Sequence, residues 1–252
     1  MKYLAPLVLW CLCITNALAT PLIWNSKEGQ IRFAQADKTD FYRLANFFET
    51  QSNGVYCGPA TAVIVLNALR LNKVKIAKDL TVLTQEERKY LPRVYDATLA
   101  KYTQRSVLTL YANKHKSIAQ VLGKPMGKAN KADFGFQLHQ YNQLLTAHGL
   151  ATRLRVVNKQ YKKKIRKEII QTLKAANSFV LVNYHRKTLG QQGGGHISPL
   201  GAYHQASDSL LIMDVNPNRS PWAWVSMDAL IAAMATHDTV ENRGFIIVSE
   251  GT

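Results

Sequence analysis

The run of residues 58–70, GPATAVIVLNALR, constrains the fold more than any other part of the chain. It has the length of a helix and is apolar on nearly every side, so we expect it to be buried at the centre of a domain. Pro59 fits the first turn of such a helix, where a missing N–H costs nothing. Cys57 then stands at or beside the N-cap, where free N–H groups and the helix dipole favour a thiolate over a thiol. A small core residue is the alternative interpretation of this cysteine.

The flanking segments predict an α+β domain with its helices first and an antiparallel sheet in its C-terminal third. Helices are expected over residues 135–148 and 161–176, on either side of a strand at 151–157. Short apolar runs predict further strands at residues 178–184, 196–204, 209–215, 222–225 and 244–249. Ser226 can cap one more helix, MDALIAAMA. Residues 76–130 show only weak helical periodicity, and we assign no chemistry to them.

The first residues have the features of a secretory signal. Lys2 precedes an almost uncharged apolar run that is too short to span a bilayer as a mature helix. Ala17 and Ala19 match an Ala-x-Ala cleavage site. We therefore expect residues 1–19 to be removed, leaving one domain at residues 20–252 in a periplasmic or secreted protein. An uncleaved membrane anchor is the alternative, and no second apolar segment of spanning length follows.

Removal of this signal would leave a single thiol. Cys11 and Cys13 lie within residues 1–19, so Cys57 would be the only cysteine of the mature chain and no internal disulfide could form. An odd cysteine in an exported protein is a packing residue, an intermolecular linker or a reactive thiol. The residues around Cys57 must decide among these.

The chain is strongly basic, with 32 Lys and Arg against 16 Asp and Glu and a formal net charge of +16. The densest cluster lies at residues 162–167, where a solvated helix face is the simplest explanation. Contact with an anionic membrane surface or attraction of anionic substrates stays open. No aromatic-interleaved basic motif indicates nucleic-acid binding. The sequence also lacks metal-ligand spacings and a phosphate-loop pattern, so we expect neither an intrinsic metal ion nor a cofactor.

Three residues complete a candidate thiol site around Cys57. Gln51, separated from Cys57 by five residues, can donate its amide N–H to an oxyanion, with the backbone N–H of the cysteine as the second donor. His196 lies 139 residues after Cys57, a separation typical of papain-type enzymes, and it opens a predicted strand. Asp214 closes an apolar strand, where a buried acid needs a partner, and we expect it to orient the imidazole.

The pairing of His196 with Asp214 depends on strand register. A turn centred at residues 206–207 would place Asp214 opposite Pro199, three residues away from His196. A bulge at Pro199 or a longer connection would bring the two side chains together. A turn residue at a strand end is the alternative interpretation of Asp214.

Four segments of the sequence resemble the phytochelatin synthase family in order and spacing. They are QSNGVYCGPATAVIVLNAL, FVLVNYHRKTLGQQGGGHISPLGAY, LLIMDV and the terminal RGFIIVS. The resemblance covers residues 47–72 and 177–249 well and the helical middle only loosely. It implies a papain-like cysteine protease fold with the nucleophile on the central helix.

This resemblance implies attack of Cys57 on the Cys-Gly bond of glutathione, with glycine leaving and a γ-glutamylcysteinyl thioester forming. Water would then release γ-glutamylcysteine, whereas a second glutathione would give phytochelatins. By the same match His196 is the general base and acid, Asp214 its orienter and Gln51 the oxyanion donor.

The resemblance also implies a set of substrate-binding residues. Asp238 and Arg243 fall where the family holds the γ-glutamyl amino and carboxylate groups, and Gly195 and Asn183 would line the same pocket. Arg186 would contact the second substrate. Without the resemblance, Asp238 is an ordinary helix-end acid and Arg243 an ordinary cation at the start of a strand.

A heavy-metal ion enters this scheme only as part of a thiolate substrate or as an activator. The cysteine-rich C-terminal domain of the plant members has no counterpart after Ser249, so we expect hydrolysis of glutathione to outweigh transfer. The sequence leaves a homodimer open.

Two other functions also stay open. Peptidases of the bacteriocin-processing type share the first motif, in which Gln and five residues precede Cys-Gly-Pro-Ala. GGGHISPL and residues 238–243 favour the glutathione enzyme. An exported binding protein that uses only its basic surface would instead bury Cys57 as an unreactive thiol.

Overall fold

The computed structural model describes residues 20–112, 115–125 and 131–251. The predicted signal, residues 1–19, lies outside the described residues. The helices are α1 (Lys27–Gln35), α2 (Phe41–Asn46), α3 (Cys57–Arg70), η1 (Leu80–Val82), α4 (Gln85–Arg88), α5 (Gln104–Ala112), α6 (Ile118–Val121), α7 (Leu138–Ala147), η2 (Lys159–Tyr161), α8 (Lys162–Lys174), η3 (Arg186–Leu189) and α9 (Met227–Met234). The strands are β1 (Leu22–Ile23), β2 (Leu150–Val156), β3 (Ser178–His185), β4 (Gly195–His204), β5 (Ser209–Ile212), β6 (Ala223–Ser226) and β7 (Gly244–Glu250).

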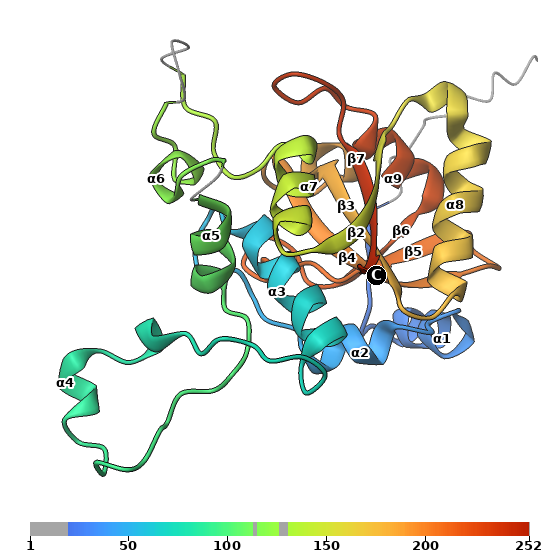
Figure 1. The fold of residues 1–252 in the computed structure, drawn as a ribbon. Helices are drawn as coiled ribbons and strands as arrows, with labels where there is room; N and C mark the ends of the chain where they lie inside the picture. Colours follow the sequence, from blue (N-terminus) through green and yellow to red (C-terminus); the bar gives the residue numbers. More distant parts are fainter. Residues whose placement is uncertain (1–19, 113–114, 126–130, 252) are drawn as a thin grey trace, which may run out of the picture.

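The strands form one seven-stranded sheet in the order β1-β6-β5-β4-β3-β7-β2. Every pair in it is antiparallel, and β4 and β3 occupy its middle (Figure 1). Antiparallel strands following a helical N-terminal part are the α+β architecture that the sequence predicts.

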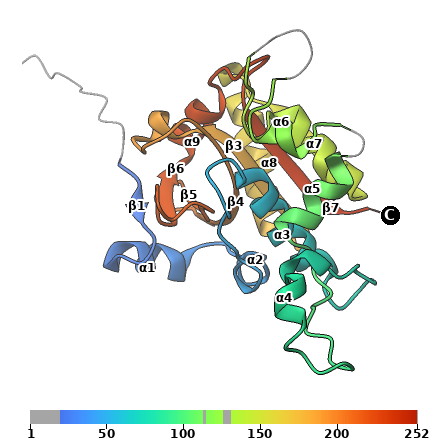
Figure 2. The ribbon, with the colours of Figure 1, turned by 90° about the vertical axis from the view of Figure 1, so that its left-hand side faces the viewer.

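Apolar side chains alternate between the two faces of this sheet. In β3, Phe179 and Leu181 belong to the core that α3, α5 and α7 share with the sheet, whereas Val180 and Val182 belong to the core under α8 and α9. Figure 2 shows α3, α5 and α7 on one side of the strands, with α9 on the other. The sheet is therefore covered on both faces, and its strands are apolar on both sides.

Helix α3 is the central helix that its composition predicts. Every residue from Gly58 to Leu69 is buried, and the helix packs on β4, α5 and α2. Tyr56 takes the N-cap position, so Cys57 is the first helical residue.

Element boundaries differ from the sequence expectations at particular places. Helix α7 begins at Leu138 and not at 135, because the side-chain oxygen of Gln140 accepts from the backbone N–H of Gln137 at the N-cap. Strand β5 ends at Ile212, before the expected 215, since the chain leaves the sheet where it approaches the site described below. Helices α1 and α2 and strand β1 escaped the sequence analysis.

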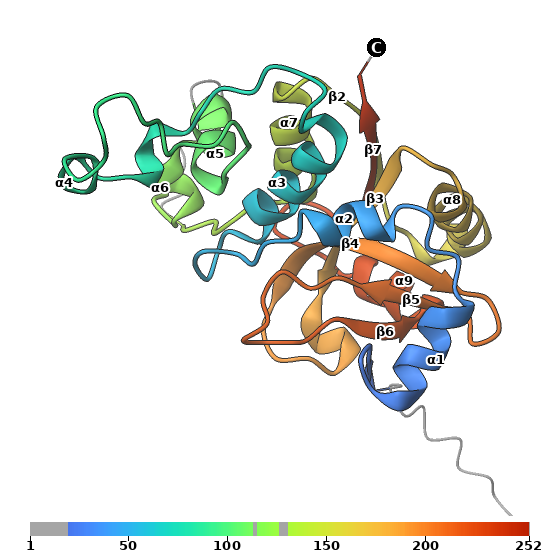
Figure 3. The ribbon, with the colours of Figure 1, turned by 90° about the horizontal axis from the view of Figure 1, so that it is seen from below.

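Between α3 and α5, residues 74–101 form a projecting segment, here called the arm, that contains η1 and α4 (Figures 1 and 3). Most of its apolar side chains are exposed, and Val94 is 99% exposed, whereas Ile76 at its base is buried. This explains why the part of residues 76–130 that lies in the arm lacks a clear apolar period, since a mostly exposed segment has no continuous core face. Among the described residues, no helix is long and apolar enough to cross a membrane.

Candidate active site

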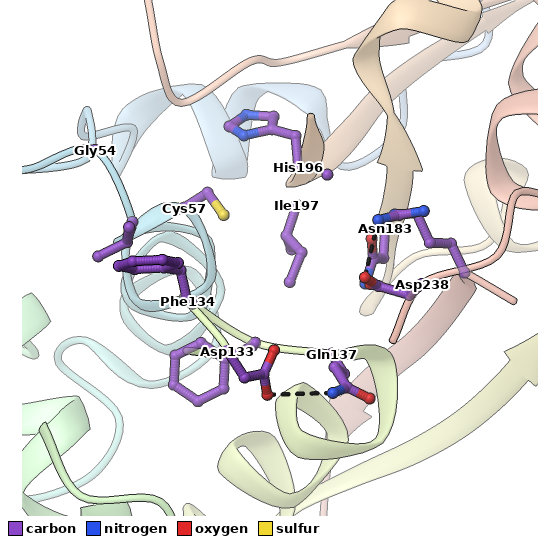
Figure 4. A pocket seen from close by; sticks show the side chains of 14 residues that line it. Gly54, Cys57, Asp133, Phe134, Gln137, Asn183, His196, Ile197 and Asp238 are labelled. Carbon is purple, nitrogen blue, oxygen red and sulfur yellow. Dashed lines mark hydrogen bonds and ion pairs between the residues drawn. The ribbon is translucent and has the colours of Figure 1, made fainter. Parts of the chain in front are cut away.

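Cys57 presents its thiol at the N-terminus of α3, next to the start of β4 (Figure 4). The imidazole of His196 and the backbone N–H groups of Ile197 and Gly58 hydrogen-bond the sulfur. Burial raises the pKa of the Cys57 thiol, but these groups and the positive charge of His196 lower it more, so the pKa lies below its ordinary value. These contacts therefore favour the thiolate of Cys57 more than in an ordinary cysteine.

His196 is the second residue of β4 and is 5% exposed. Its ring meets Tyr184 of β3 edge to face, with 5.7 Å between ring centroids. The hydroxyl of Thr61, one turn into α3, donates to the carbonyl of Ile197 across 3.2 Å. This bond fixes α3 against β4 beside both the thiol and the imidazole.

Asp214 accepts from His196 across 2.9 Å, between Nε2 and Oδ1. Strands β4 and β5 pair with a shift between Leu200 and Ala202, so Gly201 is the extra residue of a bulge. Beyond it the amide of Met213 bonds the carbonyl of Pro199. Asp214 then falls opposite position 198, on the same face as His196. The predicted bulge is present, two residues further along than Pro199.

The carboxylate of Asp214 has three further partners. Arg186 approaches both oxygens, with 2.7 Å from NH1 to Oδ2 and 2.8 Å from NH2 to Oδ1. The Tyr184 hydroxyl donates to Oδ2 at 3.1 Å and the amide of Asn216 to Oδ1 at 2.8 Å. Burial raises the pKa of Asp214, but His196 and Arg186 lower it more, so the pKa lies below its ordinary value. In turn, burial lowers the pKa of His196, but Asp214 and Cys57 raise it more, above its ordinary value.

A cavity of about 250 Å³ opens beside Cys57 and His196, near the lower end of the range for small-molecule sites. Of the residues that the resemblance assigns to substrate, four line it: Asn183, Gly195, Asp238 and Arg243. A Cβ at Gly195 would lie 3.0 Å from the Arg243 guanidinium, so a larger residue there would require the guanidinium to shift.

Arg243 and Asp238 form a pair of opposite charges in the cavity wall, 2.9 Å apart, and Arg243 also bonds the carbonyl of His237 at 2.6 Å. Arg243 Nε and Asn183 Nδ2 are buried and have no hydrogen-bond partner among the described residues. Unpaired buried donors are costly unless a ligand satisfies them, so this wall is suited to a group with acceptor oxygens.

Neither Arg186 nor Gln51 is among the residues that line the cavity. Arg186 is 3% exposed, lies behind Asp214 and is not among the residues that line the cavity. Gln51 joins the site through its backbone, which donates to the carbonyl of Val215 at 2.8 Å. Its side-chain amide donates to the carbonyl of Asn53 at 2.6 Å, and its Oε1 is buried without a partner among the described residues. Its role as oxyanion donor stays a prediction.

The sequence analysis missed one whole wall of the cavity. Residues 133–137, immediately before α7, line it with Asp133, Phe134 and Gln137 among them (Figure 4). They fall at the end of a region without a clear period, and no motif marks them. Tyr184, which bonds Asp214, was missed as well because a tyrosine in a strand has an ordinary packing role. The described parts of the chain hold no cluster of three His, Cys, Asp or Glu suited to a metal ion.

These contacts define what the site can do chemically. A thiolate beside an imidazolium can attack a carbonyl carbon, and the same imidazolium can then protonate the leaving group. The buried carboxylate fixes the ring and stabilises its charge.

The sequence is similar to those of several curated proteins. The chain is 28% identical over 231 residues to glutathione gamma-glutamylcysteinyltransferase 3 of Lotus japonicus, covering 89% of this chain and 41% of the relative. Identity is 27% over 232 residues to glutathione gamma-glutamylcysteinyltransferase 1 of Arabidopsis thaliana, covering 90% and 41%. It is 22% over 241 residues to the Schizosaccharomyces pombe glutathione gamma-glutamylcysteinyltransferase, covering 94% and 49%. The chain thus spans less than half the length of these curated relatives.

Among solved structures, the peptidase domain of Streptococcus ComA, a bi-functional ABC transporter involved in a quorum sensing pathway, aligns with a TM-score of 0.41 and 13% identity. The alignment covers 80% of this chain and 96% of that domain. The fold assignment rests on the helix and sheet described above and not on this value. The phytochelatin synthase family model matches residues 15–245, which is most of the chain, and the protein therefore belongs to the phytochelatin synthase family.

Proposed function

We propose that this protein is a thiol acyltransferase and hydrolase that cleaves the Cys-Gly bond of glutathione through a γ-glutamylcysteinyl thioester on Cys57. The observation that carries the proposal is a thiol of lowered pKa, bonded to His196, at the edge of a cavity that also contains the Asp238–Arg243 pair. The names of the relatives support the same substrate and acyl group.

In the first step the thiolate of Cys57 attacks the carbonyl carbon of the Cys-Gly bond. The C–N bond breaks, His196 protonates the departing nitrogen, and glycine leaves. In the second step His196 removes a proton from the acceptor, whose oxygen or nitrogen attacks the thioester and restores the thiolate. Asp214 stays ionised throughout and stabilises the imidazolium. Gln51 and the backbone N–H of Cys57 are the proposed oxyanion donors.

The γ-glutamyl group carries one ammonium and one carboxylate, and the cavity wall offers one residue of each opposite charge. Asp238 would take the ammonium and Arg243 the carboxylate. Arg243 Nε and Asn183 Nδ2, which have no partner in the described part of the chain, are donors that this carboxylate can satisfy. Gly195 leaves room for the guanidinium beside it.

Water as acceptor gives γ-glutamylcysteine, and a second glutathione gives phytochelatins. A heavy-metal ion belongs to this scheme as a thiolate-bound part of the substrate or as an activator. Export of the protein, with its signal at residues 1–19, is part of the proposal.

The decisive experiment measures glycine release and product mass from glutathione, with and without cadmium, for the wild-type protein and Cys57→Ala. We expect glycine only from the wild type.

An Asp238→Asn variant should raise KM for glutathione about tenfold or more, the size of a lost charged contact. No glycine from a protein whose Cys57 still reacts with iodoacetamide would reject the proposal, and cleavage of a Gly-Gly peptide instead would establish the peptidase alternative.

A further inference from the structure

Asp133 presents a carboxylate oxygen to the cavity that the proposed donor chemistry does not use. Its Oδ2 accepts from Lys116 Nζ, Gln137 Nε2 and Gln140 Nε2, each at 3.1 Å. Its Oδ1 has no hydrogen-bond donor among the described residues. Figure 4 shows Oδ2 bonded to Gln137 while the other oxygen faces the cavity.

This carboxylate is held rigidly from behind. Lys116 is 1% exposed, and its ammonium also bonds the carbonyls of Asp133 at 2.6 Å and Gly135 at 2.9 Å. Such a lysine has no reach into the cavity, since its donors are taken up by the loop before α7. The buried ammonium of Lys116 thus fixes the loop and one oxygen of Asp133. The other oxygen faces the cavity in a fixed position, as in a preformed binding site.

We propose that Asp133 binds the α-ammonium of the acceptor glutathione and thereby directs the acyl group to an amine and away from water. This inference rests on the proposed function. It assigns to the side of the cavity formed by residues 133–137 a role that is separate from the Asp238–Arg243 side.

The charges decide which substrate group fits Asp133. The donor γ-glutamyl group needs partners of both signs, which Asp238 and Arg243 supply, whereas Asp133 offers only an acceptor. The glycine end of the donor carries a carboxylate, which a carboxylate oxygen repels. The remaining cationic group that must come close to Cys57 is the amine of an acceptor glutathione.

The transfer step balances with residues already in place. The acceptor docks as an ammonium on Asp133 and gives one proton to His196, which is neutral after it has protonated glycine. The free amine then attacks the thioester carbonyl: a C–N bond forms, the C–S bond breaks, and Cys57 returns to the thiolate beside an imidazolium. The second proton lost from the nitrogen goes to solvent.

The experiment compares two products of the same thioester in the wild type and Asp133→Asn. The amide keeps the size of the side chain and its bonds to the loop but loses the negative charge. We expect the ratio of γ-Glu-Cys-γ-Glu-Cys-Gly to γ-Glu-Cys to fall about tenfold at a fixed glutathione concentration, the effect of one hydrogen bond to a charged group. Asp133→Glu should recover part of the ratio.

Two controls separate recognition of the ammonium from damage to the loop. Hydroxylamine, which is neutral near pH 7 and needs no ammonium site, traps the thioester as a hydroxamate, and its ratio to γ-Glu-Cys should fall much less in Asp133→Asn. Asp228→Asn removes a surface carboxylate that pairs with Lys162 outside the cavity, and it should leave both ratios unchanged.

An unchanged ratio in Asp133→Asn, an equal fall with hydroxylamine, or a wild type that releases glycine but forms no transfer product would overturn the inference. Absence of glycine release from the wild type is a different result, because it removes the proposed function itself.

Discussion

Asp214 accepts hydrogen bonds from the imidazole of His196, the guanidinium of Arg186 and the phenol of Tyr184. Its charge acts on the pKa of the Cys57 thiol through His196. Burial lowers the pKa of His196, but Asp214 raises it more. The imidazolium therefore persists to higher pH than in a free histidine. That imidazolium in turn lowers the pKa of Cys57.

Replacing Asp214 by Asn should therefore move the thiolate of Cys57 to higher pH. The pKa of His196 falls without the carboxylate, the neutral ring stabilises the thiolate less, and the pKa of Cys57 therefore rises. The rate of alkylation by iodoacetamide, followed against pH by mass spectrometry, measures this shift. Asp208→Asn, which removes a partner of Arg166 outside the cavity, should show the wild-type midpoint. A midpoint that stays in place or moves down in Asp214→Asn would exclude this coupling.

Arg186 acts, on this geometry, as a positioning residue for Asp214. Its replacement by Gln should lower kcat about tenfold or more while KM for glutathione changes less than about twofold, because the guanidinium touches the carboxylate and not the cavity. Steady-state kinetics with glutathione check the split between the two constants.

Loss of a buried partner costs about 3–5 kcal/mol, so Arg186→Gln can unfold the protein. Arg186→Lys keeps the charge and serves as the second variant, with partial recovery of kcat expected. A large rise of KM with unchanged kcat in either variant would instead support contact with the second substrate, the role that the family resemblance implies.

At the scale of elements, α3 is buried and the arm is mostly exposed. Two matched leucine substitutions can compare how much each element contributes to stability. Leu66 in α3 is fully buried, whereas Leu99 in the arm is 69% exposed. Leu66→Ala should lower the free energy of unfolding by about 2–5 kcal/mol, and Leu99→Ala by less than about 0.5 kcal/mol. Urea unfolding of both variants gives the two values. A cost at Leu99 equal to that at Leu66 would mean that the arm packs against something in solution.

The elements that the sequence predicts well are those with strong apolar patterns. Residues 58–70 had the length and composition of a buried helix, and the runs that became β3, β4 and β7 had those of strands. Local motifs identified Cys57 and His196 as candidate site residues. The pairing of Asp214 with His196 could not be predicted in the same way, because it depends on a bulge whose position is set by the packing of Gly201. A Cβ at Gly201 would lie 2.7 Å from the Met213 sulfur, a contact that no local pattern reveals.

Residues 133–137 could not be predicted as a cavity wall, because their placement depends on tertiary contacts. Lys116 reaches them from a segment with no clear period, and its bonds go mainly to backbone carbonyls, which carry no sequence signature. Arg186 illustrates the same limit. The family resemblance implies that it contacts the second substrate, and no sequence pattern indicated its ion pair with Asp214.

For the whole molecule, the N-terminal segment predicts the compartment in which the protein acts. We expect the mature chain to begin at Thr20, because the segment before it has the pattern of a secretory signal. Intact mass and N-terminal sequencing of protein from the extracytoplasmic fraction check this. A protein that keeps residues 1–19 and sediments with membranes would support the anchor instead.

The bulge between β4 and β5 has a consequence for how this family can diverge. One extra residue decides which side of the hairpin carries Asp214, and a further insertion or deletion within the paired residues 197–204 or 209–213 would turn the carboxylate to the opposite face of the sheet. A length change within the paired part of that hairpin would thus separate Asp214 from His196 in a single step, whereas the largely exposed residues 84–95 of the arm can change in length at little cost. Over evolutionary time, insertions should accumulate in the arm and leave the hairpin at constant length.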